Sequence, residues 1–122
     1  MIISQDIRIA LTQKLHLINA IDSQDWELEV ADPKRITEFL KSLQNDVSLT
    51  DQMKRALIIV CISSYNDYLD KYHRNMSIES QLVELLKDDI ELLKDLYQYW
   101  DIFGDEHDTF NVYTFLKEIA CR

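Results

Sequence analysis

The chain has 122 residues, 47% of them hydrophobic, which fits one domain with one core and excludes wholesale disorder. A single glycine and a single proline leave too little turn chemistry for an all-β fold and favour helices with few breaks. The formal net charge of −9 argues against direct binding to a nucleic-acid backbone, and it permits a basic protein partner or a role as a nucleic-acid mimic.

The first part of the chain predicts a helix over residues 4–22, capped by Ser4 or Asp6. Its apolar residues recur every three or four positions and mark one buried face: Ile7, Leu11, Leu15, Ile18 and Ile21.

Residues 23–32 interrupt this helical period. Trp26, Leu28 and Val30 alternate with acids in a strand-like pattern, but no second strand is visible to pair with them. We expect an extended loop that pins Trp26 onto the bundle. A tryptophan that binds a partner is the alternative.

The dipeptide Asp32-Pro33 predicts a helix start, because an acid caps helices well and proline suits the first helical position. The helix covers residues 33–45. Its inner face consists of Ile36, Phe39, Leu40 and Leu43.

We expect the whole chain to be organised around one central helix, residues 50–72. Its middle, Ala56 to Ile62, is apolar at every position, and a helix that is apolar all round belongs inside a bundle. Ser48 and Asp51 have the spacing of a capping box at its start. In its last part the apolar residues form one stripe: Tyr65, Tyr68, Leu69 and Tyr72.

Residues 78–87 and 88–102 predict two further helices, or one long helix without a break. Ser77 caps the first, and Asp88 with Asp89 suits a new start because carboxylates stabilise helix N-termini. The second helix is expected to bury Ile90, Leu93, Leu96, Tyr97 and Trp100.

Gly104, the only glycine, suits a helix end. A last short helix then starts at Thr109 or Thr114. The fold class is therefore all-α: a single-domain bundle of five or six helices over residues 1–122, around the buried central helix 50–72.

Catalytic motifs are weak in this sequence, which has no glycine-rich phosphate loop and none of the common hydrolase signatures. The closest approach to a site is the loop 105–108, where acids flank His107 and could hold a divalent metal, although it lacks the ligand ladder of a calcium loop. We expect no catalytic residue, no metal and no cofactor.

Cys61 and Cys121 are too few for a disulfide framework and predict a reduced, cytoplasmic protein in which Cys61 fills the core. The chain opens without a signal-peptide pattern, and its longest apolar run is too short to cross a bilayer.

Negative charge is concentrated in one part of the chain. From Glu84 to Asp108 nine acids stand against two lysines, which accounts for −7 of the net −9. We expect Leu92, Tyr99 and Ile102 to be exposed among these acids. Such a face predicts an interaction surface that combines charge steering with apolar anchors, or else a solubilising surface.

Residues 56–69 end in Tyr65-Asn66-Asp67-Tyr68-Leu69, which resembles a Tyr-x-x-Tyr-Leu helix of small acidic α-helical bacterial immunity proteins. Residues 93–116 contain Tyr99-Trp100, an acidic loop and a last helix, similar to the family's C-terminal part. One departure is Thr114-Phe115, where the family has Thr-Pro.

The resemblance implies a HEAT-like helical protein of contact-dependent inhibition and polymorphic toxin systems, which binds a delivered toxin domain and blocks its active site. A basic nuclease would suit an acidic inhibitor. The alternative is a non-catalytic adaptor for a basic protein partner. We expect a monomer or weak homodimer, and partner binding through Asp88, Glu91, Asp95, Tyr99, Asp101, Asp105, Glu106 and Asp108.

Overall fold

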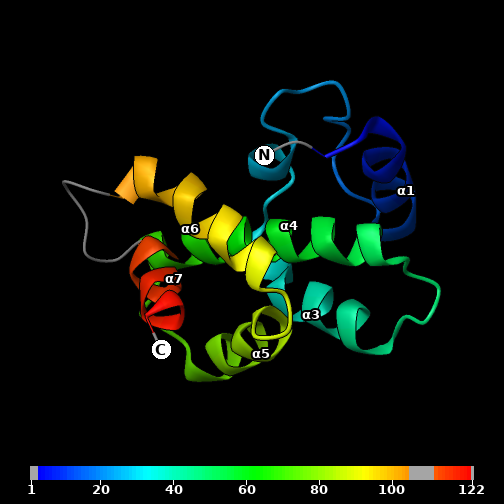
Figure 1. The fold of residues 1–122 in the computed structure, drawn as a ribbon. Helices are drawn as coiled ribbons and strands as arrows, with labels where there is room; N and C mark the ends of the chain where they lie inside the picture. The colour runs from blue at the N-terminus through cyan, green and yellow to red at the C-terminus, as the bar shows by residue number, and fades with distance from the viewer. Residues whose placement is uncertain (1–2, 105–111, 122) are drawn as a thin grey trace.

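The structure, a computed structural model, describes residues 3–104 and 112–121, with the side chains of 102–104 left out. Every regular element in these residues is helical, as predicted (Figure 1). In chain order they are α1 (Gln5–Leu15), α2 (Trp26–Glu29), the 3₁₀ turn η1 (Pro33–Arg35), α3 (Ile36–Asn45), α4 (Asp51–Lys71), α5 (Met76–Leu86), α6 (Ile90–Gly104) and α7 (Val112–Ala120). The described residues thus form seven α-helices, and the one beyond the expected six is α2.

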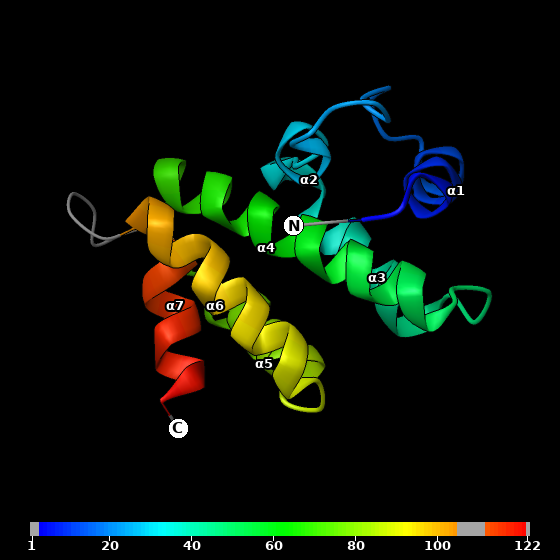
Figure 2. The ribbon, with the colours of Figure 1, turned by 45° about the horizontal axis from the view of Figure 1, so that its top comes forward.

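Helix α4 lies between the N-terminal elements α1 and α2 and the C-terminal helices α6 and α7, while α3 packs along it (Figure 2). Every residue from Ala56 to Tyr65 is buried, which confirms the predicted central helix. The buried side chains of the described residues join into one core cluster that includes residues of all seven α-helices. A fully apolar helix is stable only when neighbours cover it on all sides, so α4 determines where the other helices pack.

The start of α4 differs from the predicted capping box. Thr50 is the cap, and its Oγ1 accepts a hydrogen bond from the Met53 N–H at 3.2 Å. Ser48 instead donates both its N–H and its hydroxyl to Asp46, at 2.9 and 2.6 Å. The Ser48 hydroxyl therefore bonds within the preceding turn and does not cap the helix.

Helix α1 ends at Leu15 and not at residue 22, so that prediction was wrong. Ser4 caps it as expected, accepting from the Ile7 N–H at 3.4 Å. His16 has φ 53° and ψ 51°, a left-handed conformation that ends a helix. Beyond this turn Leu17 is buried, whereas Ile18, predicted to face inward, is 61% exposed.

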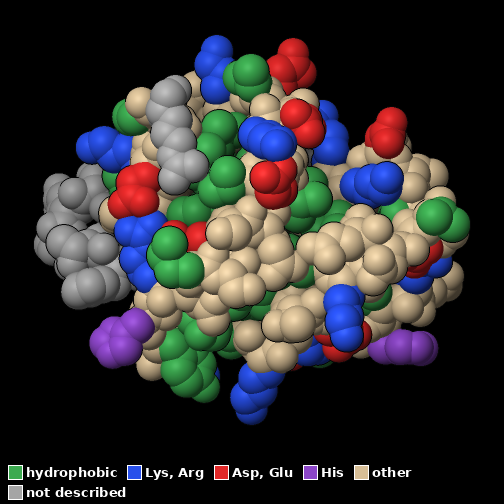
Figure 3. Space-filling model, turned by 90° about the horizontal axis from the view of Figure 1, so that it is seen from below, with side chains coloured by type: hydrophobic (Ala, Val, Ile, Leu, Met, Phe, Trp, Pro, Cys, Tyr) green, Lys and Arg blue, Asp and Glu red, His purple; other side chains and the backbone are tan. Residues whose placement is uncertain are grey.

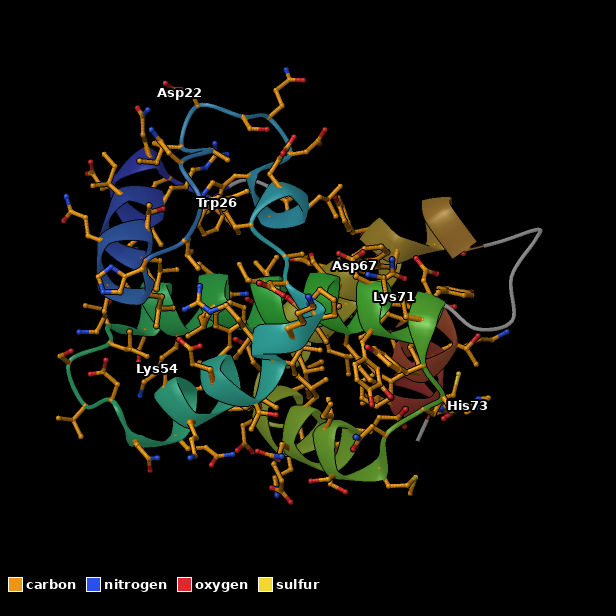
Figure 4. The ribbon with its side chains drawn as sticks, turned by 180° about the vertical axis from the view of Figure 1, so that it is seen from behind. Asp22, Trp26, Lys54, Asp67, Lys71 and His73 are labelled. Carbon is orange, nitrogen blue, oxygen red and sulfur yellow. The ribbon has the colours of Figure 1, made fainter. Side chains whose placement is uncertain are left out.

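The predicted extended loop at 23–32 contains one helical turn, α2. Trp26 and Val30, four residues apart, are both buried, and the Val30 N–H donates to the Trp26 carbonyl at 3.0 Å. The apolar alternation that suggested an extended chain is equally compatible with this i, i+4 pair. Trp26 lies between α1 and α2, above α4, and is fully buried, which confirms its predicted core role (Figure 4).

Caps separate the next helices. Asp32 accepts from the Lys34 N–H at 2.9 Å, as predicted for Asp32-Pro33, although the first turn is 3₁₀. Asn75, not Ser77, caps α5 by accepting from the Ile78 N–H at 3.0 Å. Asp89 accepts from the Leu92 N–H at 3.1 Å at the start of α6. This last bond confirms the expected break between α5 and α6, because a carboxylate satisfies free N–H groups at a helix start.

A polar network holds the C-terminal end of α4 to α5 and α7. Within this Tyr65 network, the Tyr65 hydroxyl donates to buried Glu79 at 2.5 Å and accepts from the Asn75 N–H at 3.0 Å. Arg74 donates twice to Glu79, at 2.8 and 2.7 Å, and twice to Glu118 on α7, at 2.9 and 2.7 Å. These bonds satisfy a carboxylate that burial alone would disfavour.

The face made by α3 and α5 carries basic and acidic side chains interspersed (Figure 3). There Gln44 of α3 donates to Gln81 of α5 at 2.8 Å. Across residues 3–104 and 112–121, every helix is too short or too polar to span a bilayer.

Candidate protein-interaction surface

Asp88, just before α6, and Glu91 and Asp95 on α6 form a solvent-facing surface that we call the acidic face, and Asp101 is a fourth exposed acid farther along the helix. All four side chains are exposed, and Lys94 is exposed among them. Asp88, Glu91 and Asp95 make no ion pair or side-chain hydrogen bond within the described part of the chain. These three carboxylates are therefore available to a partner.

Other acids of this stretch already have partners. Asp89 uses one carboxylate oxygen to cap α6 and the other to pair with the Arg55 Nε at 3.1 Å. Glu84 pairs with Lys87 on α5 at 2.5 Å, and this pairing raises the pKa of Lys87. The negative charge that the sequence concentrates here is thus partly neutralised, and what is left lies on Asp88 and along α6.

Asp101 lies on another part of α6 from Asp95. It acts on the stacked pair Tyr97–Tyr113, whose ring centroids are 5.4 Å apart and whose hydroxyls are 3.3 Å apart. The hydrogen bond with Tyr97, burial and the Asp101 charge together raise the pKa of Tyr113. Because Asp101 is engaged with the junction between α6 and α7, it is less available to a partner than Asp95.

The apolar side of α6 differs from the prediction at two positions. Leu92, expected among the exposed anchors, is 1% exposed, and Ile90, expected in the core, is 67% exposed. Because leucines stand at positions 92, 93 and 96, the sequence is compatible with more than one apolar stripe facing the core. The stripe that packs in the structure contains Leu92, Leu96 and Trp100, which leaves Ile90 in the first turn beyond the core.

A groove of about 760 Å³ lies between α1, α4 and α6, and we call it the α6 groove. Its volume is within the usual range of protein binding pockets. The apolar lining side chains are Ile3, Ile7, Ala56, Ile59 and Leu92. The polar lining side chains are Ser4, Gln52, Arg55, Asp95, Gln98 and Tyr99. The groove therefore brings together two predicted site residues, Asp95 and Tyr99, with α4 residues far away in the sequence.

Tyr99 does not stand out as an exposed anchor. It is half-buried, and its hydroxyl donates to the Oε2 of buried Glu27 on α2 at 3.1 Å. Burial and the Glu27 carboxylate raise the pKa of Tyr99, so the phenol stays protonated and donates. This bond holds the wall of the α6 groove against α2 and leaves one side of the residue to line the groove.

Three predicted site residues, Asp105, Glu106 and Asp108, lie outside the described residues, as do the 105–108 metal loop and the side chain of Ile102. Within the described residues no group of three or more His, Cys, Asp or Glu side chains is placed to hold a metal ion.

The sequence prediction missed the α4 and α1 walls of the groove. Gln52, Arg55, Ala56 and Ile59 follow a helical spacing along α4, and Ile7 comes from α1. The spacing was readable, but no local pattern shows that these residues line a groove beside α6, because that depends on how three helices cross.

Cys61 is fully buried in α4, as predicted, and it and the exposed Cys121 are both free thiols. Burial raises the pKa of the Cys61 thiol, which keeps it protonated and unreactive. This cysteine is therefore a packing residue.

In comparisons with known proteins, no family model matches the chain, and neither does any curated protein or solved structure.

Proposed function

We propose that this chain is an immunity protein that binds a cognate bacterial toxin domain in the cytoplasm and neutralises it by covering its active site. The observation that carries the proposal is the acidic face at α6, where Asp88, Glu91 and Asp95 are exposed and have no partner among the described residues. The resemblance of residues 56–69 and 93–116 to bacterial immunity proteins supports it.

Charge explains how such a protein would find its target. Exposed carboxylates attract a basic surface over several ångströms and raise the association rate, while apolar contacts supply most of the affinity. A toxin that cleaves nucleic acid needs a basic substrate cleft, so an acidic inhibitor is complementary to it. Inhibition of this kind requires binding only and no catalytic residue of the chain.

The first test is a pull-down with the tagged full chain from the cell that encodes it, probed for the C-terminal domain of a secreted protein encoded beside it. We expect a complex that abolishes the toxic activity of that domain. Recovery of a house-keeping basic protein in its place would favour the adaptor alternative. Failure to bind any neighbouring toxin domain would contradict the proposal.

Glu91→Lys tests the acidic face in that complex. Because Glu91 is exposed and has no ion pair among the described residues, its reversal is expected to lower the association rate about tenfold at low salt and much less at high salt. Asp70→Lys is the matched control, since it makes the same charge change on exposed α4 surface. Equal effects of the two variants would show that net charge, not this face, matters.

The three acids that lie outside the described residues are tested separately. Reversal of Asp105, Glu106 and Asp108 to Lys is expected to weaken the same complex if the loop also contacts the toxin. Binding that survives this change but not Glu91→Lys would place the interface on α6 alone.

A further inference from the structure

The floor of the α6 groove is apolar in the described part of the chain. Ala56 and Ile59 of α4, with Leu92 of α6, are each less than a tenth exposed, and Ile7 of α1 is half-buried beside them. Ala56 has a single methyl group, so α4 leaves room where a longer side chain would fill the space. The groove is large enough to take several apolar side chains of a partner.

The charges around the groove do not cancel. Among the described residues that line the groove, the cation is Arg55, which is paired with Asp89 at 3.1 Å, and that carboxylate also caps α6. The acid is Asp95, which has no partner within the described residues, and Glu91 lies one turn before it. The rim is therefore negative beside an apolar floor, which is complementary to a segment that is apolar on one side and basic on the other.

We infer that the α6 groove binds a basic amphipathic helix of the partner protein, with aliphatic side chains on the floor and a Lys or Arg at Asp95. This inference rests on the proposed function, and it identifies the part of the toxin domain that binds in the α6 groove. Helices bind grooves in this way through residues at i, i+3, i+4 and i+7.

The probe is a synthetic amphipathic peptide of about 15 residues of Leu and Lys, long enough to form a helix on binding. Its counterpart has Glu in place of Lys. Both are titrated into the full chain, and amide chemical shifts locate the bound peptide. We expect the Lys peptide to shift Ile7, Ala56 and Leu92, and the Glu peptide to bind at least tenfold more weakly, since like charges repel.

Three variants test the site. Asp95→Lys is expected to weaken the Lys peptide about tenfold, while the control Asp70→Lys changes its affinity less than twofold. Ala56→Leu fills the floor and is expected to abolish binding. Gln98→Trp covers the groove from an exposed rim position, so it blocks binding even if Ala56→Leu disturbs the fold.

Each other outcome overturns the inference. Shifts confined to another surface, or equal affinity for the Lys and Glu peptides, would show that the groove does not select a basic helix. If the chain without peptide forms a dimer that Gln98→Trp dissociates, the groove binds a second copy of the chain.

The toxin domain separates this inference from the proposed function. If the domain binds Gln98→Trp and Ala56→Leu as tightly as the wild type, the groove is not its site, although the immunity function stands. If the Lys peptide binds in the groove but no toxin domain does, the proposed function fails and the groove stands as a site for another basic partner.

Discussion

The two ends of α4 use charged residues in opposite ways. At the C-terminal end, Arg74 bridges Glu79 of α5 and Glu118 of α7, and Tyr65 donates to the same Glu79. At the N-terminal end, Arg55 pairs with Asp89, while Asp95 across the groove has no described partner.

Burial accounts for the difference. The Glu79 side chain is 8% exposed, so every oxygen needs a partner, whereas Arg55 and Asp89 are 44% and 32% exposed and water solvates them. One end of α4 is therefore closed by a buried network, while at the other end Asp95 stands beside the α6 groove with no partner among the described residues.

The largest expected effect on stability comes from removing Arg74, compared with removing Arg55 at the other end of α4. Arg74→Ala leaves the buried Glu79 carboxylate without its cation and is expected to lower the free energy of unfolding by about 2–3 kcal/mol, since Arg74 is itself partly solvated. Arg55→Ala, the matched control, is expected to cost less than about 1 kcal/mol. Urea unfolding of both variants measures the contrast, and equal losses would contradict it.

A smaller effect is expected from the tyrosine of the network. Tyr65→Phe removes a bond donated to Glu79 and one accepted from Asn75, and it should cost about 1–3 kcal/mol near neutral pH. Tyr72→Phe, at a 55% exposed position on the same helix, should change stability by less than about 0.5 kcal/mol. Matching losses in the two variants would show that the network does not depend on the Tyr65 hydroxyl.

Tyr65→Phe is also expected to change how stability depends on pH in alkaline solution. Burial, with the Glu79 carboxylate, raises the pKa of Tyr65 above its ordinary value of 10.0. The unfolded chain then loses this proton first, so stability falls as the pH rises above 10.0. The difference in the free energy of unfolding between the wild type and Tyr65→Phe should become smaller above that pH. Unfolding measured at a series of pH values checks this. A constant gap would contradict the raised pKa.

The smallest effect belongs to the groove. Asp95→Lys should change the free energy of unfolding by less than about 0.5 kcal/mol, because Asp95 is exposed and no described residue pairs with it. Thermal unfolding checks this, and a loss as large as that of Arg74→Ala would mean that Asp95 holds the fold and not a partner.

The elements that could be predicted are those with a strong local signal. The apolar run from Ala56 to Ile62 could also suit a buried strand, but its length and flanking residues favoured a helix covered on all sides, and the structure confirms the helix. Asp32-Pro33 began a helix where expected. The end of α1 could not be read in this way, because His16 adopts a left-handed conformation that carries no clear sequence signal.

The candidate site was predictable only on its charged side. Glu91 and Asp95 are exposed as expected, since isolated carboxylates stay in water. Leu92 was placed on the wrong face because its leucine-rich helix offered several apolar stripes. The bond from Tyr99 to Glu27 joins residues 72 positions apart and has no local signature.

Three features of this protein follow from residues that are close together in the chain: the all-helical fold class, the central position of α4 and the negative charge on α6. Helical spacing and the tendency to be buried are local properties of the sequence. Three other features are visible only in the folded chain: the stripe of α6 that is buried, the pairing of Arg55 with Asp89, and the groove that α1, α4 and α6 leave beside Asp95. Such features depend on how distant helices cross, and the same local pattern is compatible with more than one crossing.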